Sequence, residues 1–261
     1  MRITSDANAH YKHLQRLAAA PRACREAGRT LAEGIHLVEC AASAKASILT
    51  VVLSEAAAQE AKSLGESVAA KAGCRLIVMT PRLYNAISPV EHGTGVLAEI
   101  AIAQHALPRA LRADAVYLDG VQDPGNAGAL LRTAAAAGIR HVAASSGTTF
   151  LWSPKVLRAA MGAHFVLALY EDVPADRLAG AFAAERLAAD AHATESLYAA
   201  SWGMSPTAWL FGAEGAGLAG TTASQAQRRL RIPIDPQVES LNVAAAAAIC
   251  LFEQRRRRGQ D

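Results

Sequence analysis

The pattern of apolar and polar positions predicts an α/β chain in two parts. Over residues 1 to about 100, we expect helices at 11–20, 30–44 and 54–72, and strands at 49–53, 75–79 and 95–103. Gly34 falls inside the second of these helices, where a glycine costs about 1 kcal/mol relative to alanine. The first part is therefore expected to be a small α/β domain.

From Ala115 onward, strand and helix patterns alternate more regularly. The expected strands lie at 115–118, 141–144, 165–170, 186–191 and 208–211, and the expected helices at 127–137, 155–160 and 176–185, before a closing segment at 232–254. This alternation predicts a parallel sheet with helices on both faces. The segment 104–114 carries Pro108 and several polar residues among alanines, and it is the predicted linker. We therefore expect one domain over residues 1–105 and a second over 114–261.

Composition and cysteine spacing narrow the class of protein. The chain has 261 residues, of which 52% are apolar and 19% charged, as in globular proteins. No segment approaches the roughly 20 apolar residues that span a bilayer, and the N-terminus lacks the apolar run of a signal peptide. We therefore expect a cytoplasmic protein. The four cysteines are scattered, which favours buried free thiols over a zinc or redox site; they are Cys24, Cys40, Cys74 and Cys250.

The formal net charge of +3 is low for a strong nucleic-acid binder, but the basic residues are unevenly placed. Four arginines cluster near the start of the chain: Arg16, Arg22, Arg25 and Arg29. A run of four more, Arg255 to Arg258, lies at the end. Two interpretations of this run remain open. It can be a solvated helix end whose cations complement the helix dipole, or it can contact phosphate groups.

The segment 118–133 has the pattern of a strand, a glycine-rich loop and a helix. We predict that the helix begins at or near Asn126, a good N-cap, and that the loop allows close approach of an anion. The glycines at 120, 125 and 128 fit neither the dinucleotide fingerprint nor a P-loop. Arg132 follows about one and a half turns into the helix. A helical arginine is usually solvated, but the apolar neighbours here leave it little polar surface.

Two later segments carry further signals. An apolar strand leads into Gly212-Ala213-Glu214-Gly215-Ala216-Gly217, which is either a flexible turn or a loop that presents backbone groups to a flat heterocycle. The other segment runs from Ile232 through two prolines to Ser240-Leu241-Asn242 and an alanine-rich helix. Ser240 is the predicted N-cap of that helix.

Together, and in this order, these segments resemble the three motifs of the SpoU (TrmH-like) RNA 2′-O-methyltransferases. The residues that carry the resemblance are Asn126 with Arg132, then Gly212 to Gly215, then Ile232-Pro233 with Ser240-Leu241-Asn242. Residues 153–163 also resemble the family's helix and turn between the first two motifs. The N-terminal part is similar, more loosely, to the ribosomal-L30e-like substrate-binding domain of many members, on Ile3-Thr4-Ser5, Asn8, Lys12, Leu17, Arg25 and Glu33-Gly34.

The resemblance implies a fold, a cofactor and a set of site residues. It implies a C-terminal α/β domain with a trefoil knot, which is an exception to the rule of unknotted chains, and a homodimer formed around it. S-adenosylmethionine would be held by the backbone of Gly212, Ile232 and Leu241. The catalytic set would be Arg132, Asn126, Glu214, Ser240 and Asn242, with no metal.

The implied reaction is methyl transfer to a ribose 2′-OH of RNA, with ribosomal RNA favoured over tRNA. Because a guanidinium has a pKa above about 12, we expect Arg132 to orient the ribose or phosphate and to stabilise the developing alkoxide, rather than to act as the base. Two small departures from the family pattern, Ala159 and Ala244, stand where serine is frequent and remove no motif residue.

Three other functions are alternatives to methyl transfer to ribosomal RNA. A doubly wound oxidoreductase fails because the glycine spacing and the ribose-binding acid are missing. A non-catalytic RNA-binding protein of the same fold would be favoured by the loss of Arg132 or Glu214, and both are present. A tRNA 2′-O-methyltransferase stays open, because the sequence does not identify the RNA.

Overall fold

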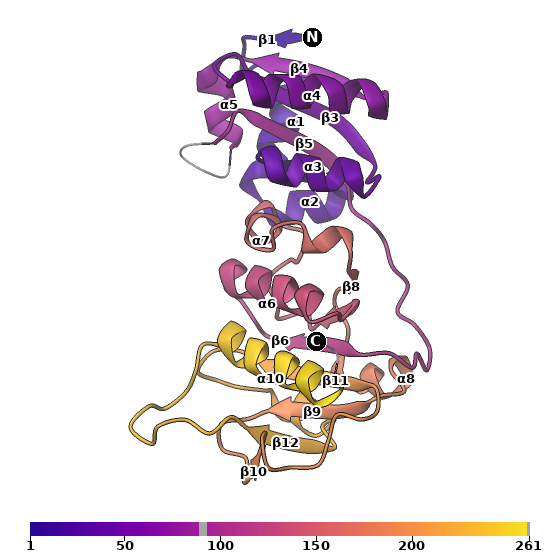
Figure 1. Ribbon diagram of the computed structural model, residues 1–261. Helices are drawn as coiled ribbons and strands as arrows, with labels where there is room; N and C mark the ends of the chain where they lie inside the picture. The colour runs from indigo at the N-terminus through magenta and orange to yellow at the C-terminus, as the bar shows by residue number, and fades with distance from the viewer. Residues whose placement is uncertain (89–92, 260–261) are drawn as a thin grey trace. The chain divides into compact units, whose positions relative to one another are not determined.

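The computed structural model describes residues 1–88 and 93–259, which divide into two compact units (Figure 1). Unit 1 contains Met1–Ala103 together with Trp152–Phe165. Unit 2 contains the rest of the chain, Gln104–Leu151 and Val166–Asp261. A short segment from the second half of the sequence thus belongs to unit 1. The domain boundaries proposed from sequence, 1–105 and 114–261, stay a prediction.

Unit 1 is built on a five-stranded mixed sheet in the order β1-β4-β3-β5-β2. The strands are β1 (Arg2–Ile3), β2 (Arg29–Glu33), β3 (Ile48–Ser54), β4 (Arg75–Met79) and β5 (Val96–Ala101). Its helices are α1 (Ala9–Ala19), α2 (Pro21–Ala27), α3 (Ile35–Ser43), α4 (Gln59–Ala72), α5 (Pro81–Ile87), α7 (Pro154–Ala159) and the 3₁₀ turn η1 (Ala163–Phe165). Strand β3 is buried along nearly its whole length, since its run of β-branched and leucine side chains fits the centre of a sheet.

The predicted helix over 30–44 is wrong in its first five residues. Arg29–Glu33 forms β2, which pairs antiparallel with β5, and the helix starts only at Ile35. Gly34 separates the two elements with a φ of 104°, a conformation that suits glycine far better than other residues. The sheet partner β5 decides the outcome here, since Thr30, Leu31 and Ala32 are fully buried between it and the neighbouring helices.

The motif residues of unit 1 have structural partners. Asn8 caps α1, because its side chain accepts hydrogen bonds from the main-chain N–H groups of His10 and Tyr11. Helix α7 begins at the cap Ser153 and packs on β2, where Arg158 donates to the buried carboxylate of Glu33 at 2.9 Å. Burial raises the pKa of Glu33, and the positive charge of Arg158 opposes that shift.

Unit 2 is built on a seven-stranded sheet in the order β10-β12-β9-β11-β6-β7-β8, in which neighbouring strands run parallel. The strands are β6 (Ala115–Asp119), β7 (His141–Ala144), β8 (Ala168–Tyr170), β9 (Glu185–Ala189), β10 (Glu195–Ser196), β11 (Thr207–Gly212) and β12 (Arg228–Arg231). The helices are α6 (Pro124–Ala136), α8 (Leu178–Ala181), α9 (Gly220–Ala223) and α10 (Val243–Arg257), with a 3₁₀ turn η2 (Ala175–Arg177). The predicted parallel sheet is confirmed.

The central strands of unit 2 carry its core. All five residues of β6 are buried, as expected of a parallel strand covered on both faces. Helix α10 packs against α6, and its alanine-rich first half allows the two backbones to approach closely. Trp209 on β11 is fully buried, and its indole N–H donates to Gln254 of α10 at 2.7 Å. This contact ties the last helix to the middle of the sheet.

The C-terminal arginines fit neither of the two interpretations completely. Arg257 and Arg258 turn back onto unit 2, where Arg257 donates to the carbonyls of Leu197, Tyr198 and Ala200 and lies 4.6 Å from the ring centroid of Trp202. Arg258 forms an ion pair with Asp114. These two cations hold the loop after β10 in place, so they are structural rather than solvated.

The described cysteines are free thiols, as predicted, but the prediction that they are buried holds for only two of the four. Cys24 and Cys250 are buried, whereas Cys40 and Cys74 are partly exposed. Burial raises the pKa of Cys24 to about 11, which keeps the thiol protonated and unreactive at neutral pH. Within the two described stretches, no group of acids, histidines and cysteines is arranged to hold a metal ion. The helices of the same residues include none with the length and apolar character of a membrane span.

Candidate functional site

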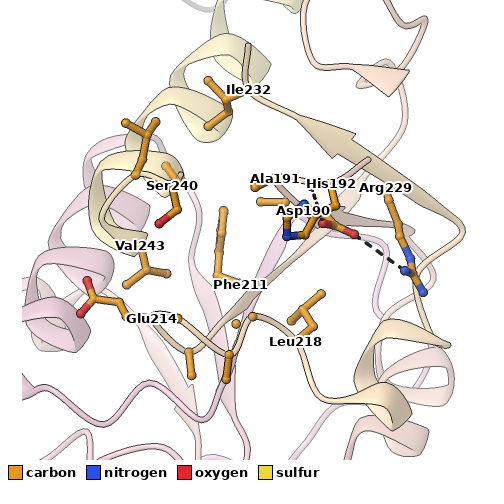
Figure 2. Close-up of a pocket in the computed structure, with 18 of the residues that line it drawn as sticks. Asp190, Ala191, His192, Phe211, Glu214, Leu218, Arg229, Ile232, Ser240 and Val243 are labelled. Atoms are coloured by element: carbon orange, nitrogen blue, oxygen red, sulfur yellow. Dashed lines mark hydrogen bonds and ion pairs between the residues drawn. The ribbon is translucent and has the colours of Figure 1, made fainter. Parts of the chain in front are cut away.

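A cavity of about 420 Å³ opens in unit 2 at the carboxyl ends of β9, β11 and β12 (Figure 2). Ligands of open parallel sheets bind at this edge, because the loops that follow the strands converge there. The cavity is lined by residues of four segments, which are 189–192 after β9, 211–218 after β11, 229–234 around β12, and 239–246 at the start of α10. Two of the three predicted motifs therefore line one cavity.

The glycine loop after β11 is a tight, closed turn. Ala213 and Gly217 exchange two main-chain hydrogen bonds, of 3.0 and 2.9 Å, across the turn. Gly212 lies so close beneath the loop that a Cβ at this position would be 2.1 Å from the carbonyl carbon of Gly217. Only glycine fits there, so the sequence Gly-Ala-Glu-Gly builds a cavity floor made of backbone. Of the two interpretations of this segment, the geometry favours the ordered loop over the flexible turn.

Asn242 joins the motifs to one another. Its side-chain amide donates to Oδ1 of Asn126 at 2.9 Å and to Oε1 of Glu214 at 2.5 Å. Its Oδ1 accepts from the main-chain N–H groups of Ala244 and Ala245, which makes Asn242 the N-cap of α10. One side chain thus fixes the start of the last helix, the helix of the first motif and the loop of the second.

Both predicted helix caps differ from the observed ones. Helix α6 starts at Pro124, and its N-cap is Asp123, whose carboxylate accepts from the N–H of Asn126 at 2.7 Å. Ser240 does not cap α10; it is exposed and lines the cavity two residues before the true cap, Asn242. In each case the neighbouring acid or amide takes the capping role and leaves the predicted side chain available for other contacts.

The three residues predicted to hold the cofactor all line the cavity. Gly212 forms part of its floor, and Ile232 and Leu241 are half-buried in its walls. The main-chain N–H and C=O of Leu241 have no hydrogen-bond partner in the stretches that the structure describes. Unpaired peptide groups at the wall of a cavity are suited to bind the polar edge of a ligand.

Of the predicted catalytic residues, Arg132 alone stands apart. Asn126, Glu214 and Asn242 form one hydrogen-bonded group, and Glu214 and Ser240 line the cavity. Arg132 is exposed on α6, is not among the lining residues, and forms no ion pair with another described residue. Six positions along a helix advance the axis by about 9 Å and turn to a different face, which separates Arg132 from Asn126.

The sequence patterns do not reveal the side of the cavity that Asp190, His192 and Arg229 form. Figure 2 shows Glu214, Ser240 and Val243 along one side and Asp190, His192 and Arg229 along the other. Asp190 accepts from the main-chain N–H of His192 at 2.9 Å and lies 3.7 Å from the guanidinium of Arg229. Asp190 and His192 follow β9 without a recognisable motif, and Arg229 lies in β12. The only feature of the sequence that points to this part of the cavity is the predicted end of a strand at Ala191.

The lining fits S-adenosylmethionine, which is a net cation with a flat purine and a charged amino-acid end. The volume lies in the range of small-molecule sites, and the walls are mainly apolar. The ionisable lining residues comprise three acids and one arginine besides a histidine: Asp190, Glu214, Glu239, Arg229 and His192. An excess of carboxylates favours a cationic ligand over an anionic one. Backbone at Gly212 and Leu241 is available for the heterocycle.

Comparison with known proteins agrees with this geometry. The model of the SpoU rRNA Methylase family matches residues 114–252, and the model of the MRM3-like substrate binding domain matches residues 8–98. An uncharacterized tRNA/rRNA methyltransferase of Synechocystis sp. is 31% identical over 97% of this chain and 93% of its own length. The 23S rRNA (guanosine(2553)-2'-O)-methyltransferase RlmP of Bacillus subtilis is 28% identical over 86% of this chain and 88% of its own.

A solved structure shares the whole architecture. The AdoMet-bound rRNA methyltransferase from Sinorhizobium meliloti superposes with a TM-score of 0.86 at 26% identity, over 98% of both chains. The likeness confirms the predicted fold class, a C-terminal α/β-knot domain with a small α/β domain before it, and the predicted cofactor, S-adenosylmethionine. With matches to both of its parts, this chain belongs to the SpoU rRNA methylase family of methyltransferases.

Proposed function

We propose that this protein transfers a methyl group from S-adenosylmethionine to a ribose 2′-OH of ribosomal RNA. The observation that carries the proposal is the hydrogen-bonded group of Asn126, Glu214 and Asn242 beside a cavity floored by a glycine loop. Three separate sequence motifs meet there, and the family matches supply the reaction class. The cofactor, when bound, supplies an electrophilic methyl group.

The residues of the cavity divide into holding and orienting groups. Backbone at Gly212, Ile232 and Leu241 would bind the cofactor's polar edges, and the closed loop over 213–217 keeps Gly212 in place without reorganisation. Glu214 and Asn126 act through Asn242, which fixes where α10 starts relative to the cavity. Ser240 is exposed on the cavity wall and is free to contact the ribose.

The proposal includes a homodimer with Arg132 as the residue that meets the RNA. Because Arg132 is exposed and lies outside the lining of its own cavity, a second chain packed at the mouth would complete the site. Arg132 would then orient the ribose or its phosphate and stabilise the developing alkoxide, since a guanidinium stays charged at neutral pH. Light scattering should give twice the chain mass of 27.2 kDa.

Mixing two inactive variants tests whether the site is shared. Arg132→Ala and Asn242→Ala should each lose methyl transfer. If Arg132 of one subunit serves the cavity of the other, mixed dimers regain part of the activity, because one of their two sites is intact. No recovery from demonstrated mixed dimers would place Arg132 and its cavity in the same chain.

The substrate is tested by labelling. The protein is incubated with radiolabelled S-adenosylmethionine and total RNA from cells that lack the protein, and the 2′-O-methyl is mapped. Label in one ribosomal RNA nucleotide supports the proposal. Label in tRNA alone would mean that the substrate is tRNA, while the reaction would still be methyl transfer to a ribose 2′-OH. Binding of the RNA without any transfer would favour the non-catalytic RNA-binding protein.

A further inference from the structure

A second cavity, of about 760 Å³, opens in unit 1 at the edge where β2, β3 and β4 begin and β5 ends. Its walls are His10 and His13 of α1, the strand starts at Arg29, Thr50 and Arg75, the turn Gly73-Cys74, and Glu99 near the end of β5. Two arginines and two histidines thus surround one carboxylate. The site described in unit 2 uses none of these residues.

The carboxylate of Glu99 is already occupied. It accepts from Nη1 of Arg29 at 3.0 Å and lies 2.8 Å from Nε2 of His13, and only 4% of its side chain is exposed. Burial alone would raise the pKa of Glu99, but the hydrogen bonds from His13, Arg29 and Thr50 outweigh it and hold that pKa low. Glu99 therefore stays ionised, and its carboxylate holds His13 and Arg29 in the cavity wall.

Arg75 is left without a counter-ion. Its Nη1 lies 2.9 Å from Nδ1 and 3.1 Å from Nε2 of His10, so its contact is with an imidazole ring and not with a carboxylate. No ion pair joins Arg75 to a carboxylate in residues 1–88 and 93–259. Five other arginines of unit 1 do have acidic partners: Arg2, Arg22, Arg29, Arg82 and Arg158.

We propose that this cavity, with Arg75 and His10 at its open side, binds a backbone phosphate of the RNA substrate. This inference rests on the proposed function in one respect, which is that the phosphate belongs to RNA. A phosphate oxygen offers the acceptor that the guanidinium lacks, and His10 can donate to the same group. Glu99 holds Arg29 and His13 in the cavity wall, and the remaining N–H groups of Arg29 can donate to the same phosphate. The cavity is wide and its arginines are exposed, which suits a phosphate on a polymer.

The salt dependence of RNA binding tests the proposal. Binding of a fluorescent short RNA hairpin to the full chain is measured from about 50 to 200 mM salt without cofactor. Replacing one phosphate-contacting cation lowers the slope of log K against log salt by about 1, so Arg75→Gln should show that loss and bind several-fold more weakly at low salt. Arg75→Lys keeps the charge and should retain the slope.

Arg82→Gln is the matched control, since it removes one exposed arginine of the same unit that already pairs with Asp6. The proposal is overturned if Arg75→Gln binds like the unmodified protein, or if Arg82→Gln loses as much slope. S-adenosylmethionine binding by calorimetry should be equal in all of these proteins. The RNA-binding assay needs no turnover. If methyl transfer were absent, the proposed function would fail, but the binding data would still decide whether Arg75 contacts a phosphate.

Discussion

The side-chain amide of Asn242 donates to Oδ1 of Asn126 across 116 positions of sequence, at a distance of 2.9 Å. The same amide reaches Glu214, while Oδ1 of Asn242 caps α10. Because the amide nitrogen and the amide oxygen of Asn242 have different partners, a substitution can remove one set of contacts and keep the other. The carbonyl oxygen serves local helix stability, and the NH₂ group serves the cavity.

Asn242→Ser should therefore separate the two roles. Serine is a good N-cap and keeps the stability of α10 within a few tenths of a kcal/mol, but it has no amide to reach Asn126 or Glu214. Asn242→Ala should also lose the cap, at about 1 kcal/mol. We expect both variants to lose most methyl transfer and only the alanine variant to melt earlier. Full activity in Asn242→Ser would show that the amide contacts are dispensable.

Gly212→Ala tests the backbone floor of the cavity. The added Cβ would meet the carbonyl carbon of Gly217, which is backbone and cannot rotate away, so the loop over 213–217 must move. We expect S-adenosylmethionine affinity, measured by calorimetry, to fall at least tenfold. Gly220→Ala is the control, because a Cβ there meets nothing within 4 Å. Equal affinity in both variants would mean that the cofactor does not depend on this loop.

How much of this could be predicted from sequence depends on the partners of each element. Five of the seven strands of unit 2 are predicted because a buried strand shows a short apolar run in any context, and β7 matches residue for residue. The sequence pattern does not predict the other two, β10 and β12. Residues 30–33 are predicted as helix because Leu31 and Ala32 fit either period. The antiparallel partner β5 decides in favour of the strand, and it lies 64 or more positions away along the chain.

The site shows the same division. Gly212, Ile232 and Leu241 could be placed by motif resemblance, and all three line the cavity. Asp190 could not, since a carboxylate after β9 matters only once β11 and β12 flank it. The cap of α6 was within reach: Asp123-Pro124 places a capping acid before a proline at the first helical position, a stronger start signal than Asn126.

Arg132→Ala should uncouple cofactor binding from methyl transfer. Arg132 is exposed and forms no hydrogen bond or ion pair with the other residues that the structure describes, so its removal should leave the melting temperature unchanged within about 1 °C and the affinity for S-adenosylmethionine unaltered. Methyl transfer to RNA should fall by about 100-fold or more, as for loss of one transition-state donor. Arg132→Lys, which keeps the charge without the planar fork, should recover part of it. Turnover near that of the unmodified protein would remove Arg132 from the mechanism.

Glu253 gives a prediction for acid stability. Its carboxylate accepts from Nε of Arg256 at 2.7 Å and from Nε of Arg257 at 2.8 Å. Hydrogen bonds from Arg256 and then Arg257 lower the pKa of Glu253 from 4.5 to about 2, against the effect of burial. A depressed carboxyl pKa contributes stability that is complete above about pH 4.5 and is lost as the pH falls toward 2.

Because this stability is present at neutral pH and lost in acid, Glu253→Gln should be less stable than the unmodified protein at pH 7 but not at pH 2. At pH 7 the variant should melt about 4 to 8 °C lower, the shift expected for about 2 kcal/mol from charge-assisted hydrogen bonds. The gap should narrow as the pH is lowered from 4.5 toward 2, since the carboxyl group of Glu253 is then protonated and no longer accepts charge-assisted hydrogen bonds from the arginines. Glu26→Gln, which breaks the exposed Arg22–Glu26 pair, is the control and should change the midpoint by less than about 1 °C at any pH. A gap that stays constant down to pH 2 would mean that Glu253 acts through packing and not through its charge.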